Sequence, residues 1–395
     1  MDNKTDCRTV KPEESANSRD GLIKVTSIVL NKFKNDSRVI KTCRSLVNSG
    51  YETRVIALHD DSLPEFEIME GFSVHRVRLT TIHWPRKKIV QAIKYLEFSF
   101  RVLIRYRGHD IYHCNDLHTL PVGVLIKWLS KKEVRLVYDA HEYETETDDV
   151  NALEKFFRKQ MERFLVRFAD KMITVSDSIA SEYARLYGID KPAIVLNTPL
   201  FSNVIKSDNL RRDLEVPANQ TIFLYQGGLA HGRGIDVLLN AFDSADMADK
   251  AIVFMGYGPM EPEIKAKAQK CNNIYFREAV APAEVILHTS SADVGISTIE
   301  NTCLSYYYCL PNKLFEYAMA EIPVIVSNLA EMKKIVNQYG LGVVAQENSV
   351  VGIRQAINEM QNFDLEKFVE NVKEFKSVYN WETQEQSLLK IYSSL

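Results

Sequence analysis

The chain has 395 residues, of which 46% are hydrophobic and 26% are charged, and its formal net charge is −3. This length allows two domains that each bury a core, and the composition is that of a folded globular protein. The small net charge excludes a global electrostatic field that would attract nucleic acid.

The first twenty residues are polar and lack the apolar stretch of a secretory signal peptide, so we expect a disordered tail over residues 1–20. No apolar run approaches the length of a membrane span. The cysteines form neither a Cys-x-x-Cys pair nor a metal-ligand spacing, which predicts reduced thiols in a cytoplasmic protein. They are Cys7, Cys43, Cys114, Cys271, Cys303 and Cys309.

Short β-branched segments alternate with helical patterns along the first half of the chain. Val39, Cys43, Leu46 and Val47 recur at helical spacing, which predicts a helix over residues 35–50. Strands separated by helices form a parallel sheet. The expected strands are 23–30, 53–58, 110–114, 134–140, 171–176 and 193–197.

The alternation pauses over residues 198–218, which are polar and irregular, and we interpret this stretch as an interdomain connection. It then restarts, which predicts a second doubly wound domain and a cleft between the carboxyl ends of the two sheets. The second set of expected strands is 221–228, 251–258, 273–279, 292–298, 322–327 and 342–346.

Two strand-to-helix turns of the second half carry glycines. The first contains Gly227 and Gly228 and brings Arg233 to the start of a helix, where backbone N–H groups and a guanidinium favour a phosphate. A tight turn with a solvated arginine explains the same residues. The second turn has Gly256 and Gly258, which helix packing explains equally well, and it lacks the full dinucleotide fingerprint of a dehydrogenase.

The segment "PNKLFEYAMA" follows a run of three tyrosines. Pro311 precedes a predicted helix whose core face holds Leu314, Phe315, Ala318 and Met319. Lys313 and Glu316 are three residues apart and are therefore neighbours near the helix N-terminus. A cation and a helix dipole there attract an anion, and a carboxylate accepts hydrogen bonds from sugar hydroxyls. A surface salt bridge is the alternative.

Polar clusters follow two expected strands of the first half, where doubly wound sheets place their sites. One cluster holds His113, Asn115, Asp116 and His118, and the other holds Asp139, His141 and Glu142. Single histidines are usually structural, but two clusters at successive strand ends favour a functional site. No third ligand or second-shell pattern completes a metal site, so we expect none.

Residues 83–108 are strongly basic. Ile89, Ile93, Leu96, Phe100 and Leu103 fall on one helical face, which we expect to belong to the core. The excess of cations also suits an anionic membrane surface or an anionic lipid-linked substrate. Those expected to contact the membrane or acceptor are Arg86, Lys87 and Lys88.

From about Ile23 to its end, the chain resembles the GT-B glycosyltransferases of family 4, which are retaining enzymes that use nucleotide sugars. The segments that carry the resemblance include "YHCNDLHTLP", "VYDAHEYETE", "YQGGLAHGRGID", "GYGP" and "LPNKLFEYAMAEIPVIVS". The resemblance implies two Rossmann-like domains facing a cleft, with an acceptor domain over 21–200 and a donor domain over 201–380. It also implies that residues 381–395 cross back to the first domain.

The resemblance also implies roles for individual residues. Glu316 would bind the ribose of the donor and Arg233 the diphosphate, with Gly227 and Gly228 in the turn before it. The segment from Leu310 to Leu314 would hold the sugar and phosphate through backbone N–H groups. The transferred sugar and the acceptor would meet Asn115, Asp116 and His118, with His141 and Glu142 as further candidates.

Two positions depart from the family pattern. Tyr308 stands where many members have a glutamate that reaches the transferred sugar, and Gly228 stands where many have an arginine. Lys313 and Arg277 would therefore compensate for the missing cation.

The expected function is transfer of a sugar from a nucleotide sugar to a glycan or lipid-linked acceptor, without a metal or other cofactor. The expected location is the cytoplasm, with peripheral contact to an anionic membrane, and surface polysaccharide synthesis is the expected setting. A nucleotide-sugar epimerase and a non-catalytic sugar-binding subunit remain open as alternatives, and a dehydrogenase is disfavoured.

Overall fold

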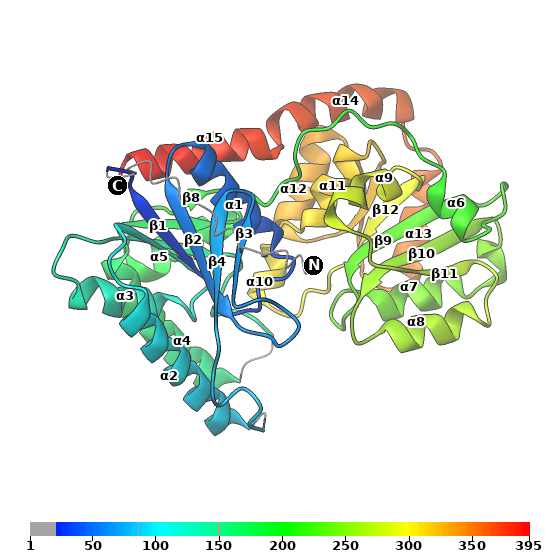
Figure 1. Ribbon diagram of the computed structural model, residues 1–395. Coiled ribbons are helices and arrows are strands. Elements are labelled where there is room, and N and C mark those ends of the chain that lie inside the picture. Colours follow the sequence, from blue (N-terminus) through cyan, green and yellow to red (C-terminus); the bar gives the residue numbers. More distant parts are fainter. Residues whose placement is uncertain (1–20, 86, 149–150) are drawn as a thin grey trace, which may run out of the picture.

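The computed structural model describes residues 21–85, 87–148 and 151–395. These residues form two α/β domains that lie side by side, each with a central sheet covered by helices on both faces (Figure 1). The tail predicted for residues 1–20 and the side chain of Arg86 lie outside the described residues. Within the described part of the chain, no helix combines the length and apolarity needed to cross a bilayer.

In the described part of the first domain, the sheet has the order β3-β4-β2-β1-β5-β6-β7-β8, and its strands are parallel except for the β3–β4 pair. Its elements are β1 (Lys24–Ile28), α1 (Ser37–Asn48), β2 (Glu52–Leu58), β3 (Phe66–Met69), β4 (Phe72–Val77), α2 (Lys88–Arg105), β5 (Ile111–Asn115), α3 (Leu120–Leu129), β6 (Arg135–Ala140), α4 (Ala152–Leu165), η1 (Val166–Phe168), β7 (Lys171–Thr174), α5 (Asp177–Tyr187) and β8 (Ala193–Ile194).

The second domain has a fully parallel sheet of order β11-β10-β9-β12-β13-β14. Its elements are α6 (Asn209–Asp213), β9 (Thr221–Gly228), α7 (Ile235–Phe242), η2 (Ala245–Met247), β10 (Lys250–Tyr257), α8 (Glu261–Ala268), β11 (Ile274–Glu278), η3 (Pro282–Glu284), α9 (Val285–Thr289), β12 (Val294–Ser297), α10 (Leu304–Tyr307), α11 (Asn312–Met319), β13 (Val324–Ser327), α12 (Ala330–Tyr339), β14 (Gly342–Ala345), α13 (Val350–Met360) and α14 (Leu365–Val378).

The strand orders place the functional region. Strand order reverses between β1 and β5 in the first sheet and between β9 and β12 in the second. Ligands of doubly wound sheets bind outside the carboxyl ends of the strands at such reversals. The predicted two-domain α/β fold is therefore confirmed, and each sheet has one such point at its carboxyl edge.

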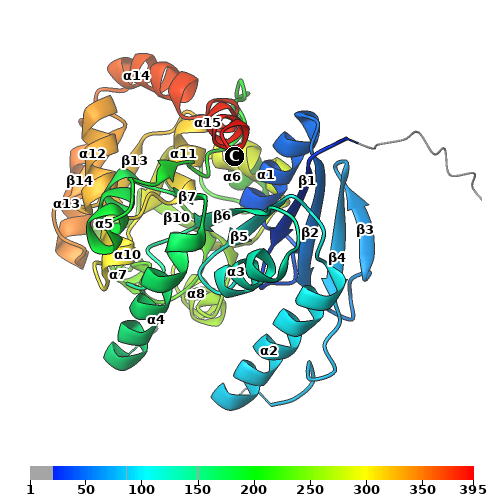
Figure 2. The same cartoon turned by 90° about the vertical axis from the view of Figure 1, so that its left-hand side faces the viewer.

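The last helix, α15 (Trp381–Ser393), returns from the second domain and packs on α1 of the first (Figure 2). Asn380 breaks the chain between α14 and α15, and its side chain accepts a hydrogen bond from the backbone N–H of Thr383. Trp381 is 1% exposed, and its indole N–H donates to Ser45 Oγ at 3.1 Å. The crossing helix is therefore part of the first domain's core.

Three features differ from the sequence-based expectations or were not anticipated. The connection over residues 198–218 contains the short helix α6 and is not wholly irregular. Strands β3 and β4 were not anticipated; β4 runs parallel to β2, and β3 adds one antiparallel pair at the edge of the sheet. The expectation that the apolar face of α2 belongs to the core is wrong, because Ile89, Leu96 and Phe100 are exposed.

Trp381→Ala is expected to lower the free energy of unfolding by about 3–5 kcal/mol, because it empties a buried aromatic site and leaves Ser45 without its donor. Trp84→Ala is the matched control, since Trp84 is 50% exposed. Denaturant unfolding followed by circular dichroism measures both. Equal stability of the two variants would show that α15 is not a structural part of the first domain.

Candidate functional site

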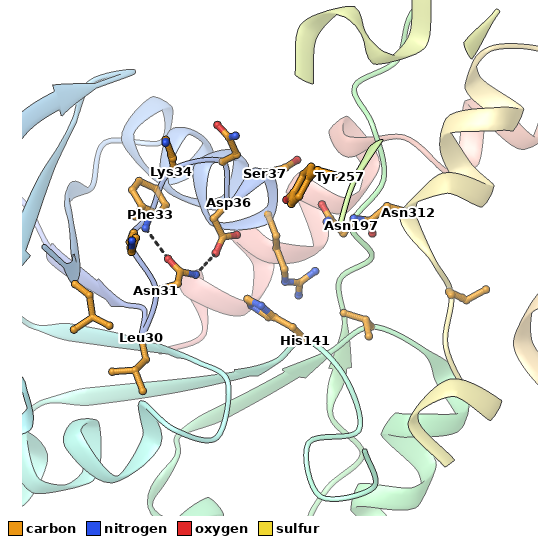
Figure 3. A pocket seen from close by; sticks show the side chains of 16 residues that line it. Leu30, Asn31, Phe33, Lys34, Asp36, Ser37, His141, Asn197, Tyr257 and Asn312 are labelled. Carbon is orange, nitrogen blue, oxygen red and sulfur yellow. Dashed lines mark hydrogen bonds between the residues drawn. The ribbon is translucent and has the colours of Figure 1, made fainter. Parts of the chain in front are cut away.

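Two cavities lie at the carboxyl edges of the sheets. The small cavity, of about 380 Å³, lies against β9, the loop before α11 and the start of α11. The large cavity, of about 1010 Å³, is lined mainly by the β1–α1 loop, with Tyr257 and Asn312 from the second domain on its other side (Figure 3). His141, Val175, Leu310 and Asn312 line both cavities. The two cavities therefore adjoin across the domain interface.

Lys313 is a buried cation of the small cavity. Pro311, in extended conformation, precedes α11, so that Lys313 lies in the first turn of the helix. Its Nζ lies 3.6 Å from the ring centroid of Tyr225. Burial, followed by repulsion from Arg233, lowers the pKa of Lys313 to about 7. A solvated surface salt bridge is therefore excluded for this residue.

Glu316 lies one turn further along α11 and also lines the small cavity. Its Oε2 accepts a hydrogen bond of 2.5 Å from Gln226 Nε2, and Gln226 Oε1 accepts one of 2.7 Å from Thr289 Oγ1. Burial raises the pKa of Glu316, while the hydrogen bond from Gln226 and the charge of Lys313 act in the opposite direction. The buried Gln226 thus orients this carboxylate.

Arg233 approaches the same cavity from the β9–α7 turn. Its guanidinium carbon lies 4.6 Å from the ring centroid of Tyr306, a residue of α10. Gly234 caps α7 with a φ of 73°, and a Cβ there would lie 2.1 Å from the carbonyl oxygen of Thr298. Only glycine fits this approach, which brings the arginine turn against the loop after β12.

In the first domain, His141 lines both cavities and is held by two carboxylates. Its Nδ1 lies 3.3 Å from Asp116 Oδ1, and its Nε2 lies 3.5 Å from Asp139 Oδ2. Burial alone lowers the pKa of His141, but Asp116 and then Asp139 raise it, and the net shift is upward. The imidazole therefore carries a proton to higher pH than an ordinary histidine.

Asp139 is buried and paired. Arg38 donates to both of its oxygens, from Nε at 2.9 Å and from Nη2 at 2.7 Å. His113 Nε2 lies 3.3 Å from the same carboxylate, and His113 Nδ1 lies 2.8 Å from Tyr392 Oη of α15. Burial raises the pKa of Asp139, but the charge of Arg38 and the two histidines lower it by a larger amount. The net result is a pKa well below the usual value.

The first polar cluster divides between structure and site. Asn115 is buried and donates to Ser27 Oγ and to the carbonyl of Ile28, so its role is to join β5 to β1. Asp116 contacts His141, whereas His118 is exposed on the turn before α3 and lines neither cavity. Sequence spacing placed these residues together, but their side chains point in different directions.

Glu142, the remaining member of the second polar cluster, is exposed to the small cavity and accepts a hydrogen bond from Ser305 Oγ at 3.4 Å. Lys87 and Lys88 are exposed and line neither cavity. Any contact they make with an acceptor or membrane is therefore separate from the cavities.

The glycine and leucine candidates of the second domain have mixed placements. Gly227 and Gly228 line the small cavity, together with Pro311 and Asn312, while Leu314 is fully buried in the core. A Cβ at Gly256 would lie 1.9 Å from the carbonyl oxygen of Gly227, and one at Gly258 would lie 2.2 Å from that of Leu229. Both glycines allow β10 to pack against the β9 turn, and they line neither cavity.

Arg277 and Tyr308 lie away from the cavities, contrary to their expected places. Arg277 pairs with Asp213 at 3.4 Å and lines neither cavity. Tyr308 packs on the first domain's core cluster that contains Tyr183 and Tyr187. It is therefore an interdomain packing residue, because α10 reaches across to the first domain.

Sequence reasoning missed several lining residues. The loop over residues 30–38 forms one wall of the large cavity, and Asn31, Phe33 and Asp36 shape it. Asn31 Nδ2 donates to Asp36 Oδ2 at 3.0 Å, and Phe33 N donates to Asn31 Oδ1 at 2.8 Å. Its position after the first strand of a doubly wound sheet was the available signal. Gln226 and Tyr306 had no such signal.

No group of three or more histidine, cysteine, aspartate or glutamate side chains suited to hold a metal ion occurs in the described ranges. The cationic groups at the small cavity, Arg233 and Lys313, suit an anion. The cavity therefore offers charge for a ligand that is itself negative.

Asp139→Asn is expected to lower the pKa of His141 and to destabilise the fold by about 3–5 kcal/mol, because it leaves Arg38 buried without its partner. Asp116→Asn is the matched control. Asp116 adopts a φ of 62°, which asparagine tolerates, and its side chain is 42% exposed. It should lower the pKa of His141 with little loss of stability. Histidine NMR titration and denaturant unfolding measure the two effects, and an unchanged His141 pKa in both variants would contradict the geometry.

Comparison with known proteins agrees with this geometry. Residues 37–199 match the family model described as a glycosyl transferase 4-like domain, and residues 220–362 match that described as glycosyl transferases group 1. An uncharacterized glycosyltransferase of Methanocaldococcus jannaschii is 23% identical over 88% of this chain and 90% of its own length. The putative teichuronic acid biosynthesis glycosyltransferase TuaC of Bacillus subtilis is 22% identical over 78% and 76%.

Solved structures share the fold. Sucrose-phosphate synthase from Thermosynechococcus elongatus superposes with a TM-score of 0.76 at 17% identity, covering 94% of this chain and 98% of that one. HepE of Anabaena in complex with UDP-glucose superposes with a TM-score of 0.71 at 14% identity, covering 94% and 100%. With the two family models matched in the order of the two domains, the chain is a glycosyltransferase of the GT-B type.

Proposed function

We propose that the protein transfers a sugar from a nucleoside-diphosphate sugar to a hydroxyl group of a glycan or lipid-linked acceptor, with retention of the anomeric configuration. In this proposal the diphosphate lies between Arg233 and Lys313, and the ribose lies beside Glu316. The sugar extends towards His141, and the acceptor occupies the large cavity.

The observation that carries the proposal is the pair of cations in the small cavity. Among the described residues, neither Lys313 nor Arg233 forms an ion pair with a carboxylate, and the charge of Arg233 lowers the pKa of Lys313. Two like charges held close in a partly buried site repel each other, so an anion that bridges them is stabilised. A nucleoside diphosphate supplies that anion. The half-buried carboxylate of Glu316, one helical turn away, supplies an acceptor for hydroxyl donors.

The same cations serve the chemistry. The bond between the anomeric carbon and the diphosphate oxygen breaks, and negative charge grows on the leaving group, where Arg233 and Lys313 stabilise it. A bond forms between the anomeric carbon and the acceptor oxygen on the same face, and the acceptor proton passes to the leaving diphosphate. Retention follows from this front-face path, which the resemblance of the "PNKLFEY" segment to family 4 supports.

His141 is placed between donor and acceptor, since it lines both cavities. Its raised pKa keeps the ring protonated to higher pH, so that it donates hydrogen bonds from both nitrogens when it is charged. Both ring nitrogens face carboxylates, Nδ1 towards Asp116 and Nε2 towards Asp139. We therefore assign the ring the role of a fixed positive charge at the boundary of the two cavities, and not that of a hydrogen-bond donor to the sugar.

The relatives indicate the setting. TuaC is named for teichuronic acid biosynthesis, and HepE was solved with UDP-glucose. We propose a hexosyl donor and a role in the synthesis of a surface polysaccharide or glycoconjugate, on the cytoplasmic side of a membrane. A thermal-shift screen with UDP-, GDP-, ADP- and dTDP-sugars tests the donor class, because a bound ligand stabilises by mass action. No stabilisation by any of them would contradict the proposal.

Glu316→Ala and Arg233→Ala are each expected to lower kcat by about 10²–10³, because each removes a group aimed at the donor. Glu374→Ala, an exposed glutamate of α14, is the control and should retain wild-type turnover. Turnover is measured as release of nucleoside diphosphate with the donor that the screen identifies. Wild-type rates for both cavity variants would refute the assignment of the small cavity.

Binding of the nucleoside diphosphate is expected to take up a proton above pH 7. The pKa of Lys313 is about 7 in the free protein, and a bound diphosphate raises it. Affinity should therefore fall as the pH rises above about 7. Calorimetry at pH 8 in buffers of different ionisation enthalpy measures the uptake, and Lys313→Arg should abolish it because arginine stays protonated. Equal uptake by both proteins would assign the proton to another group.

A further inference from the structure

Exposed apolar side chains concentrate on three neighbouring helices of the first domain. Nearly half of the large exposed hydrophobic residues in the described chain lie on α2, α3 and α4, which pack in that order. They are Ile89, Ile93, Leu96, Phe100, Ile104, Leu125, Trp128, Leu129, Leu153, Phe156, Phe157, Met161 and Phe164. We call this set the apolar surface. None of these residues lines either cavity, so the surface is separate from the site.

Helix α2 has two apolar faces, and only one of them belongs to the core. Phe98 and Val102 are buried against the domain. The exposed residues of α2 recur at steps of three and four from Ile89 to Ile104, which places them on one face opposite the buried one. Ile89 is 77% exposed, and the first half of α2 projects beyond the sheet (Figure 2).

Helix α4 repeats the arrangement. Leu153, Phe156, Phe157, Met161 and Phe164 also recur at helical spacing, while Leu165 packs inward. Phe157 is 62% exposed. These bulky side chains in water, on a helix of fourteen residues, have no role in the core.

Contacts between the helices join these residues into one surface. The rings of Trp128 on α3 and Phe164 on α4 lie 6.4 Å apart between centroids. Lys88 Nζ, at the start of α2, lies 3.6 Å from Glu154 Oε2, at the start of α4. The two projecting helix ends therefore lie close together, and α3 connects them at their base.

The charges around the apolar surface identify what covers it. Residues 84–107 contain seven lysines and arginines and one glutamate. Residues 151–168 contain five lysines and arginines and two glutamates. Both segments are therefore positively charged, although the whole chain has a net charge of −3. Of the three glutamates, Glu97 pairs with Arg101, Glu154 pairs with Lys88 and Arg158, and Glu162 is buried, which leaves the lysines and arginines in excess. The rim is therefore cationic. A second copy of the same surface would be repelled, whereas an anionic lipid bilayer is complementary in both charge and apolarity.

We propose that the apolar surface of α2, α3 and α4 inserts into the headgroup region of an anionic bilayer. Apolar side chains enter the boundary with the acyl chains, Trp84 and Trp128 lie at the interface, and the lysines and arginines contact lipid phosphates. This assignment does not depend on the proposed function of the cavities. It adds α3 and α4 to the contact, and it makes the contact one of insertion as well as of charge.

Membrane insertion would bring the cleft to the lipid surface. The described residues 141–148 precede α4, which begins at Ala152. In that segment, Glu146 pairs with Lys155 and Lys159 of α4, and its carbonyl accepts a hydrogen bond from Ser305 N of the second domain. An acceptor whose sugar is carried on a lipid would thus be presented beside the large cavity.

Vesicle flotation tests the proposal. Full-length protein is mixed with vesicles of phosphatidylcholine alone or with about 30% phosphatidylglycerol, which gives the negative surface potential of a cytoplasmic leaflet. The wild type should float with the anionic vesicles. Phe156→Ser/Phe157→Ser and Leu96→Ser/Phe100→Ser should each reduce the bound fraction about tenfold or more, because each removes two inserted side chains. Ile205→Ser/Val351→Ser is the matched control, because these two apolar residues are 83% and 64% exposed elsewhere.

Two further measurements distinguish insertion from adsorption to the lipid surface and from self-association. The Trp84→Phe variant retains two tryptophans, Trp128 and the buried Trp381. Brominated lipid should quench the fluorescence of this variant only when the vesicles are anionic. Light scattering without lipid reports the oligomeric state. No flotation of the wild type, equal flotation of the apolar variants, or a dimer that those variants dissociate would overturn the proposal. Circular dichroism confirms that each variant is folded before it is compared.

Discussion

The carboxylate of Asp139 is fully buried at the end of β6, and it remains ionised there because Arg38 donates to both of its oxygens. Arg38 also donates to the carbonyl of Val195 at 2.7 Å, so that one guanidinium ties α1 to β6 and to the segment after β8. His113 and His141 approach the same carboxylate from two sides. One buried ion pair thus sets the position of the first sheet's carboxyl edge.

The second domain lacks such compensation at its own edge. Lys313 and Arg233 are held by aromatic rings, those of Tyr225 and Tyr306, and by no carboxylate among the described residues. A ring positions a cation but does not neutralise it, so the charge remains available to a ligand. The first domain therefore balances its buried charge internally, whereas the second keeps part of its charge for whatever occupies the cavity. This difference fits the proposal that a negatively charged ligand completes the site of the second domain.

The alternation of strands and helices predicted both sheets except for β3 and β4, and the glycine turn with Arg233 and the pair Lys313 and Glu316 were identified from local spacing. Residue spacing could not predict the direction in which each side chain points. Tyr308 belongs to the same short segment but faces the other domain, because α10 crosses the interface. Gln226 owes its place to Thr289, 63 residues later, which no local pattern shows. In α2 the helical spacing of apolar residues identifies two apolar faces, but it does not show which of the two faces is buried.

The two chain crossings between the domains lie next to each other. The backbone N–H of Trp381 donates to the carbonyl of Pro199, so the return crossing into α15 is hydrogen-bonded to the outgoing one. Figure 1 shows both on the side of the molecule where α14 and α15 lie. Because the two connecting segments are hydrogen-bonded to each other, they lie along one line at this side of the domain interface. A rotation of the domains about that line would widen the cavities most on the side away from it, while α15 stayed packed on α1.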